Sequence, residues 1–347
     1  MFSFKNTFLD SLALHRVGNK NRAESNFESA ELYNFGEALG SSLQQFFQKP
    51  FKKSAEQHHF THSTDINHNE VYIYAKAIFD NPDCLHEQSV NILYHLYKQS
   101  NHSNIKSGEL FIAFFRDVMW EDELINAIGI FKSENKYSFL EISRDERNLE
   151  LKRHDGLSLE KMDKGCMIFN TEAAEGYRVL TVDNNRYDAN YWPRYFLNID
   201  NVKDEVFHTK SYLQLCDDFA KDVIAPQANT QEQMKFLTDS VEYFNNNENF
   251  VFDDFTKEVE TLKPFQEEFR NYQADYNLQD VKYFPISPTA LKTASRKFDH
   301  LIKLDTNIQI KLDLNDPDAS REFLEKGYDE EKGMHYYKVY FNEEVKE

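Results

Sequence analysis

The chain has 347 residues, 40% of them hydrophobic, and because a single core stops growing at roughly 250–300 residues, this length predicts two domains. Only 10 Gly and 8 Pro are present, which excludes a collagenous or linker-rich protein. The formal net charge of −19 excludes a uniformly basic nucleic-acid-binding surface, so any such surface must be local.

The N-terminal part of the chain predicts one strand followed by helices. Residues Leu9–Val17 alternate apolar with polar side chains, which is the period of a strand with one buried face. In Ser29–Gln48, apolar residues recur at spacings of three and four, with Ser29 as the expected N-cap and Pro50 as the stop. The same spacing predicts helices at Asn67–Phe79 and His86–Gln99.

Short apolar runs follow one another between Ile105 and Asn185, with turn residues between them. Their sequences are GELFIAFFRDV, INAIGIFKS, YSFLEISR, LELKRHD, GCMIFNTE and GYRVLTVD. They predict an antiparallel β meander with the preceding helices packed on one face. Residues 1–186 are therefore expected to form an α+β domain.

The pattern changes after Asn185, and residues 187–347 are expected to form a mixed helical and β domain. Helices are predicted at Val206–Ile224, ended by Pro226, and at Gln231–Phe244, Phe252–Leu262, Pro264–Tyr276 and Ser287–Phe298. Strands are predicted at His300–Leu314 and Met334–Phe341, with a short helix at Asp318–Lys326 between them.

Cysteine usage and the absence of long apolar runs predict the compartment of the cell in which the protein is found. Cys84, Cys166 and Cys216 are far apart and odd in number, so neither a disulfide framework nor a cysteine-rich zinc site is expected. The first residues lack the pattern of a signal peptide, and no window approaches the ~18 apolar residues of a membrane span. These features predict a soluble cytoplasmic protein that does not enter a membrane.

Six strings along the chain carry a family resemblance. They are SLALHRVGNK (Ser11–Lys20), IKSGEL (Ile105–Leu110), AIGIFKSE (Ala127–Glu134), DKGCMIFNTE (Asp163–Glu172), VDNNRYDANYW (Val182–Trp192) and LDTNIQIKLD (Leu304–Asp313). In these strings the chain resembles the nucleoid-associated protein family of the NdpA type, in the form found in Bacteroidetes-like bacteria. The resemblance implies a cytoplasmic bacterial protein that is found with the nucleoid, binds double-stranded DNA and has no established enzymatic activity. It brings no catalytic or base-reading residues with it.

The charge distribution allows a local basic face. Residues 200–280 hold 18 Asp/Glu against 7 Lys/Arg, whereas residues 286–312 hold five basic against two acidic residues. The five basic residues form the first candidate for phosphate contact: Lys292, Arg296, Lys297, Lys303 and Lys311. On a helix, Lys292 and Arg296 share one face. The alternative is an ordinary solvated face that balances the acidic helices.

Two smaller basic clusters are further candidates for DNA binding. One is Lys49, Lys52 and Lys53 around Pro50, and the other is Arg16, Lys20 and Arg22. Neither contains a base-reading motif, so binding is expected to involve mainly the DNA backbone, with weak sequence specificity. The alternative for both clusters is a plain surface role.

Four histidines, His58, His59, His62 and His68, crowd one polar stretch together with Asp65. Imidazole and carboxylate groups can bind a divalent metal. The spacing matches no helical metal motif, however, and the segment has the composition of a loop. No metal and no cofactor are therefore expected.

A nuclease is a weaker alternative. Glu150 and Lys152 share one strand face near Asp145, as a metal-dependent phosphodiesterase would require, but such triplets are common by chance. The polar and aromatic turn with Asp183, Arg186, Asp188 and the Tyr191–Trp192 pair is interpreted as a hydrogen-bonded domain junction.

Three functional hypotheses follow. The first is a non-enzymatic, nucleoid-associated protein that binds double-stranded DNA with low specificity. The second is an adaptor at the nucleoid whose acidic 200–280 region contacts basic protein partners, and the third is the nuclease. A homo-oligomer is compatible with all three.

Overall fold

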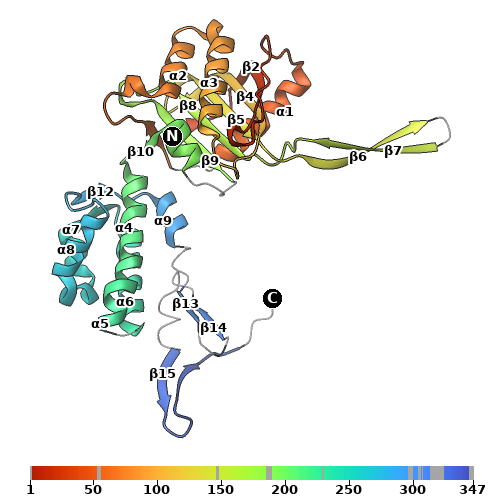
Figure 1. Cartoon of the computed structure of the whole chain (residues 1–347). Coiled ribbons are helices and arrows are strands. Elements are labelled where there is room, and N and C mark those ends of the chain that lie inside the picture. Colours follow the sequence, from red (N-terminus) through yellow and green to blue (C-terminus); the bar gives the residue numbers. More distant parts are fainter. Residues whose placement is uncertain are drawn as a thin grey trace. The chain divides into compact units, whose positions relative to one another are not determined.

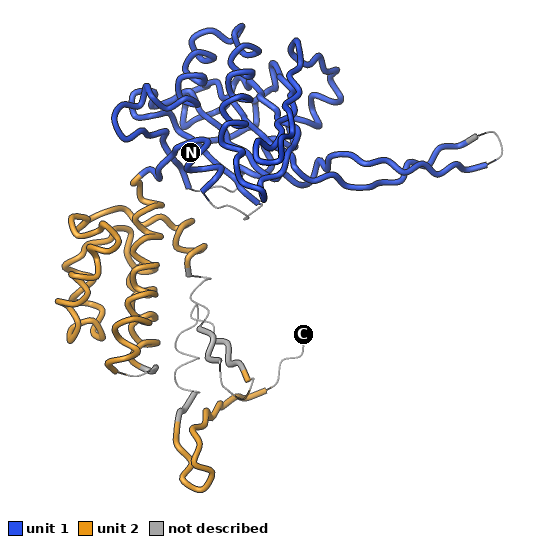
Figure 2. The backbone as a smooth tube through the Cα atoms, viewed as in Figure 1, with its two compact units in different colours: residues 1–202 blue, residues 203–347 orange. Residues whose placement is uncertain are grey.

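Most of the apolar runs of the first half pair into one antiparallel sheet, and the α+β class predicted from them is confirmed. The computed structural model describes residues 2–52, 56–145, 148–184, 190–228, 230–295, 300–303, 306, 308–312 and 324–343. Two compact units divide after Val202: unit 1 is Met1–Val202 and unit 2 is Lys203–Glu347 (Figure 2). Arg186, where we expected the boundary, lies outside the described residues. The segment Tyr191–Asn201 packs into unit 1.

The sheet of unit 1 has the strand order β1-β4-β5-β8-β9-β3-β10, and β2 also pairs with β4. Its strands are β1 (Phe2–Ser3), β2 (Phe8–Val17), β3 (His58–Phe60), β4 (Gly108–Trp120), β5 (Glu123–Ser133), β8 (Lys164–Phe169), β9 (Arg178–Asp183) and β10 (Ile199–Asn201). β4, β5 and β8 carry apolar residues at successive positions, so both of their faces need a cover.

Helices cover both faces of this sheet (Figure 1). On one face, α2 (Glu70–Asp80), α3 (Leu85–Gln99) and the π-helix η6 (Tyr191–Leu197) pack on Ile112, Ile130 and Ile168. On the other face, α1 (Glu37–Gln48) and the 3-10 turn η2 (Lys49–Phe51) pack on Phe111 and Phe131. The expectation that all three helices share one face is therefore wrong for α1.

Two predicted helices start later than expected. α1 begins at Glu37 and not after Ser29, because residues 27–33 run along β2: Phe27 pairs with Arg16, and the Tyr33 amide donates to the carbonyl of Leu12 at 2.7 Å. α2 begins at Glu70, where the Asn69 side chain accepts from the amide of Tyr72 at 3.0 Å. Short 3-10 turns complete unit 1: η1 (Lys20–Arg22), η3 (Ile66–His68), η4 (Pro82–Cys84) and η5 (Ala173–Glu175).

The predicted meander is interrupted by a hairpin that leaves the sheet. β6 (Tyr137–Asp145) and β7 (Asn148–Gly156) pair with each other in a separate sheet, and β5 pairs directly with β8. We call Tyr137–Gly156 the arm. Figure 1 shows it extending away from the sheet of unit 1. Lys132 and Lys164 stand opposite each other in the β5–β8 pair, so the arm and its connections are inserted between neighbouring backbone positions.

Unit 2 is built around a helical core. Its helices are α4 (Glu205–Phe219), the π-helix η7 (Ala220–Ile224), α5 (Ala225–Gln227), α6 (Thr230–Asn246), α7 (Phe252–Glu258), η8 (Glu260–Phe265), α8 (Gln266–Asp275) and α9 (Pro288–Ser295). They enclose aromatic side chains such as Tyr212, Phe219 and Phe250, next to the strand pair β11 (Asn249–Val251) and β12 (Tyr283–Pro285). Pro226 does not end the first helix, because it lies in the first turn of α5.

The C-terminal part of unit 2 contains two hairpin pairs. β13 (His300–Lys303) pairs with β14 (Gln309–Leu312), so the single strand expected over His300–Leu314 is a hairpin. β15 (Leu324–Asp329) pairs with β16 (Met334–Val339). Of the helix expected at Asp318–Lys326, residues 318–323 lie outside the described part, and Leu324–Lys326 form strand.

Candidate nucleic-acid interface

The first basic cluster lies in unit 2 and is only partly described. Lys292 is exposed on α9. Arg296 and Lys297 lie outside the described residues. Lys303 of β13 pairs with Gln309, and Lys311 of β14 pairs with Leu301, so these two lysines lie two rungs apart on the two strands of one β pair.

The second basic cluster lies in unit 1 and gains a member that sequence reasoning missed. Lys52 follows η2 and is exposed, and it lines an open depression together with Lys5 and Gln48. Lys49 forms an ion pair with Glu160. Lys53 is outside the described residues. Lys5 is 44 or more residues away from this cluster in sequence, and only the packing of the N-terminus beside η2 brings it there.

The third basic cluster is largely engaged by its own unit. Arg16 donates to Glu109 Oε1 at 2.6 Å and to Ser107 Oγ at 3.3 Å. Arg22 donates to the carbonyl of Ile105 at 2.7 Å. Lys20 is exposed on η1. Because both guanidinium groups are tied to the segment 105–109, this cluster offers fewer free donors to a phosphate than its composition suggests.

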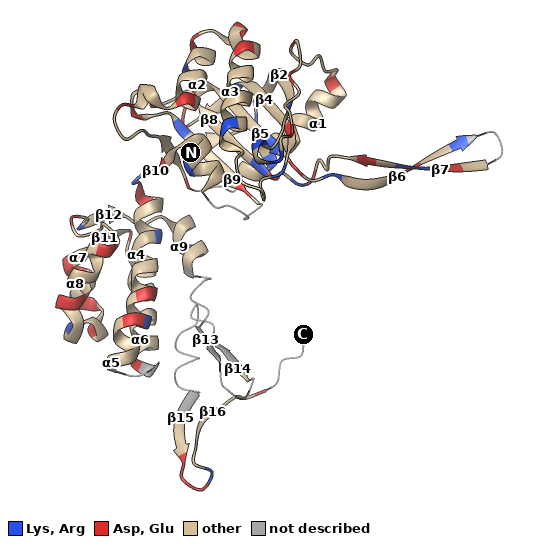
Figure 3. Ribbon diagram, in the orientation of Figure 1, with Lys and Arg blue, Asp and Glu red and all other residues tan. Residues whose placement is uncertain are grey.

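The helices of unit 2 present an acidic surface. Figure 3 shows Asp and Glu on α4, α7 and α8. Exposed examples are Asp253, Glu258 and Glu267. Two further carboxylates face aromatic hydroxyls: Tyr272 donates to Asp222 at 2.7 Å, and Tyr276 donates to Asp218. Partial burial and these carboxylates raise the pKa of both tyrosines, so the phenols remain neutral donors at physiological pH.

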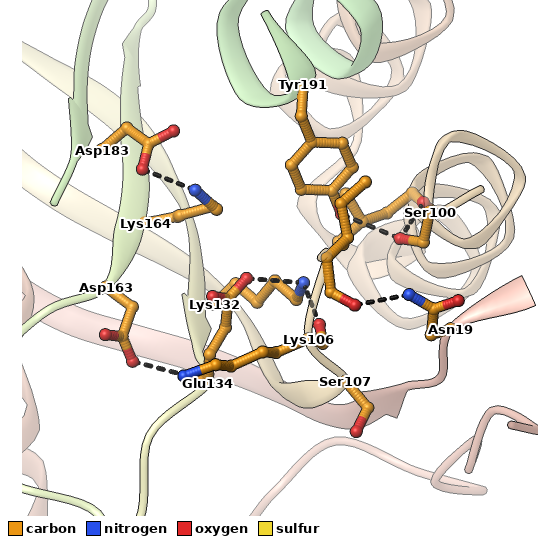
Figure 4. A network of polar contacts seen from close by, with 12 residues as sticks. Asn19, Ser100, Lys106, Ser107, Lys132, Glu134, Asp163, Lys164, Asp183 and Tyr191 are labelled. Atoms are coloured by element: carbon orange, nitrogen blue, oxygen red, sulfur yellow. Dashed lines mark hydrogen bonds and ion pairs between the residues drawn. The ribbon is translucent and has the colours of Figure 1, made fainter. Parts of the chain in front are cut away.

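A buried network of charged groups lies inside unit 1 (Figure 4). Lys132 has no exposed surface, and its ammonium donates to Glu134 at 2.8 Å and to the carbonyl of Lys106 at 2.6 Å. Lys164 donates to Asp183 at 2.5 Å. The Lys132 and Lys164 ammonium groups lie 5.3 and 5.7 Å from the centre of the Tyr191 ring, at cation–π range.

Burial governs the chemistry of this network. Desolvation lowers the pKa of Lys132, and the Glu134 carboxylate opposes that effect. Since Lys132 and Lys164 are enclosed, neither reaches a phosphate of a macromolecular ligand. The sequence holds one signal for this network, which is a lysine at the end of the otherwise apolar run INAIGIFKS.

Asp163 hydrogen-bonds the segment that follows the arm to the segment that precedes it. Its carboxylate accepts from the amides of Glu134 and Asn135 at 2.6 and 3.1 Å and from the Asn135 side chain at 2.6 Å. Lys106 donates to the same Asn135 side chain at 2.8 Å. Glu134 and Asn135 precede β6, and Asp163 precedes β8. The arm therefore leaves unit 1 at a fixed place.

The four histidines do not converge on one point. His59 contacts Glu172 at 2.7 Å, and Glu172 also accepts from Arg178 at 2.6 Å. His62 and His68 both contact the hydroxyl of Thr64, each at 3.0 Å. His58 is mostly buried, and this burial lowers its pKa. Within the described residues, no group of three or more His, Cys, Asp or Glu could hold a metal ion.

The residues of the nuclease alternative lie on the arm. Glu150 and Lys152 are both more than half exposed on β7 and contact each other at 3.6 Å. The expected junction turn lies within unit 1: Tyr191 and Trp192 are fully buried in its core, and Asp183 belongs to the charge network. Arg186 and Asp188 are outside the described residues.

Comparison with known families shows which family the chain matches. A family model described as nucleoid-associated protein YejK matches residues 13–334, which include parts of both units. The chain belongs to this family. A comparison with curated proteins finds no match. The family resemblance of the six strings is thereby confirmed, and this nucleoid-associated family is not a known family of enzymes. Among the described residues, no helix is long and apolar enough to cross a membrane.

Proposed function

We propose that this nucleoid-associated protein binds double-stranded DNA in the bacterial nucleoid with low sequence specificity and catalyses no reaction. Membership of the nucleoid-associated family is the observation that supports this function. The basic clusters supply a physical means, because each Lys or Arg that neutralises a phosphate releases counterions. Neither the described helices nor the described strands carry a recognised base-reading motif, so phosphate contacts would dominate.

We place the main contact on the unit 2 cluster of Lys292, Arg296, Lys297, Lys303 and Lys311. Lys292 is exposed, and the surrounding segment has a net positive charge in an otherwise acidic half of the chain. Lys49, Lys52 and Lys53 form the second surface, with Lys5 beside them. Arg16, Lys20 and Arg22 rank third, because Glu109 and backbone carbonyls occupy both arginines.

Charge reversal tests this ranking. The triple variant Lys292→Glu, Arg296→Glu and Lys297→Glu is expected to weaken DNA binding at least tenfold in band-shift titrations, and the salt dependence of the remaining binding should become shallower. A matched control carries the same charge change on the same unit, at Lys257, Lys263 and Lys332, which are all more than half exposed. A general electrostatic effect would weaken both variants equally, whereas a local contact weakens only the first.

A second triple variant, Lys49→Glu, Lys52→Glu and Lys53→Glu, separates the two candidate surfaces. We expect it to have the smaller effect of the two. Normal affinity in both candidate variants, with unchanged melting curves, would contradict DNA binding through these clusters. Affinity that is insensitive to salt would contradict a phosphate-dominated contact.

The acidic surface of unit 2 supports a second candidate function. Exposed carboxylates such as Asp253, Glu258 and Glu267 could attract a basic protein partner at the nucleoid. Such an adaptor would retain a basic protein after nuclease treatment and release it at high salt. Reversing these carboxylates to Lys should abolish the retention and leave DNA binding intact.

A further inference from the structure

The arm has one apolar face that the rest of unit 1 leaves open. Register places Ile142 opposite Leu151, Leu140 opposite Arg153 and Arg144 opposite Leu149. Because side chains alternate along a strand, Leu140, Ile142, Leu149 and Leu151 point to the same side. Their exposed fractions are 64, 65, 72 and 66%.

The opposite face of the arm is polar over its outer part. It carries Glu141, Ser143, Glu150 and Lys152 there, and His154 contacts Glu141 at 2.7 Å. Phe139, which is 54% exposed, lies on this face nearer the base and stacks on His154. This division into an apolar and a polar face is that of a sheet with one side covered. A two-stranded hairpin is at best marginally stable in water by itself, and soluble monomers seldom expose an apolar patch above roughly 300–600 Å².

The arm is held at its base. Asp163 ties the two connecting segments together, and the Lys161 ammonium lies 5.3 Å from the centre of the Tyr137 ring, at the first residue of β6. These contacts hold the base of the arm in place. Less conformational entropy is therefore lost when a partner covers the apolar face.

The charges on the arm indicate which partner binds its apolar face. The arm contains four basic residues, Arg144, Arg147, Lys152 and Arg153, and five acidic residues, Glu141, Asp145, Glu146, Glu150 and Asp155. This near balance gives phosphates no net attraction, so DNA is a poor occupant. It also means that two arms can approach without the repulsion expected from a chain of net charge −19.

We propose that the apolar face of the arm is an interface between two copies of this chain. Two arms packed face to face and antiparallel, about a two-fold axis, cover the aliphatic side chains of both copies. In that arrangement the tip of one arm lies over the base of the other. Arg144 near the tip then meets Asp155 near the base, an opposite-charge pair that occurs twice by symmetry. A dimer would also present each basic cluster twice to DNA.

The mass of the full-length protein in solution tests this interface. The monomer is 41.1 kDa, and we expect sedimentation equilibrium to show twice that mass as the concentration rises. The variant Ile142→Lys with Leu151→Lys should remain monomeric, with at least a hundredfold weaker association. The control changes the cross-strand pair on the polar face by the same charge, Ser143→Lys with Glu150→Gln, and should dimerise normally.

Chemical cross-linking gives a readout that does not depend on the stability of those variants. In a Cys84→Ser background, Ile142→Cys is expected to form covalent dimers with a short bismaleimide, and Ser143→Cys is not. Cys166 and Cys216 are buried and should not react. A wild-type protein that stays monomeric at every concentration, a dimer that survives the double lysine change, or equal cross-linking from both cysteine positions would overturn the proposal.

Discussion

β5 and β8 in the sheet and β6 and β7 in the arm are consecutive strands of one chain, yet they have opposite surroundings. Side chains on both faces of β8 are buried, while nearly every described side chain of β7 is exposed. Both pairs contain a lysine and a glutamate two residues apart: Lys132 and Glu134 at the end of β5, and Glu150 and Lys152 on β7. The same kind of ion pair therefore occurs in the buried interior and on the solvated surface of one unit.

This difference shows how the surroundings of an ion pair determine its contribution to stability. In the sheet, an ion pair without access to water cannot lose one partner without leaving a buried charge. On the arm, water solvates whichever partner remains. The two strand pairs therefore allow similar substitutions to be compared at buried and at exposed positions of one unit.

The largest difference is expected from the two lysines. Lys132→Ala leaves Glu134, which is almost fully buried, without its ammonium partner and should lower the free energy of unfolding of unit 1 by about 3–5 kcal/mol. Lys152→Ala on the arm should cost less than about 1 kcal/mol. Denaturant unfolding followed by tryptophan fluorescence measures this, because both tryptophans, Trp120 and Trp192, lie in unit 1. Equal losses in the two variants would contradict the burial argument.

The next difference is expected from a matched pair of isoleucines. Ile130 on β5 is fully buried, and Ile130→Ala should destabilise unit 1 by about 2–5 kcal/mol through lost burial and the cavity that remains. Ile142→Ala on the arm should change stability by less than about 0.5 kcal/mol. Measurement at low protein concentration keeps the proposed dimer from contributing. A large loss at Ile142 under those conditions would show that the arm packs against its own unit.

The smallest expected effect is on how the free energy of unfolding changes with pH. Burial, together with the nearby His86, lowers the pKa of His15 below its ordinary value of 6.5. The unfolded chain therefore takes up this proton at a higher pH than the folded chain, so stability is lost as pH falls below about 6.5, by up to roughly 1.4 kcal/mol per pH unit. His15→Asn should flatten this slope in denaturation curves taken between pH 7 and pH 5.

Much of the sheet could be predicted from the sequence, and so could the class of the fold. The continuous apolar runs of β4, β5, β8 and β9 identified their strands, and the three-four spacing identified α2, α3 and the helices of unit 2. The runs YSFLEISR and LELKRHD correctly indicated strands. An apolar run does not say which strand it joins or what covers it, however, so the departure of β6 and β7 from the sheet could not be foreseen.

Other differences came from contacts between segments that are distant in sequence. Ser29 looks like an N-cap, but its hydroxyl donates to the carbonyl of Leu14 in β2, and this pairing prevents a helix before Glu37. Lys5 joined Lys52 only through packing of the N-terminus. The charge network around Lys132 needs five separate segments to meet, and a one-dimensional pattern contains no such information. The placement of the DNA contact itself stays a prediction.

Because Lys132 and Lys164 occupy the same rung of the β5–β8 ladder, the chain leaves the sheet and returns to it at one point. In topological terms, the arm is an elaborated hairpin loop. Insertions of this kind disturb their host little, since each doubling of loop length costs only about 0.6 kcal/mol in closure entropy. Natural selection can therefore lengthen, shorten or exchange the arm while the sheet stays constant, so that relatives can diverge in their assembly and keep the same scaffold.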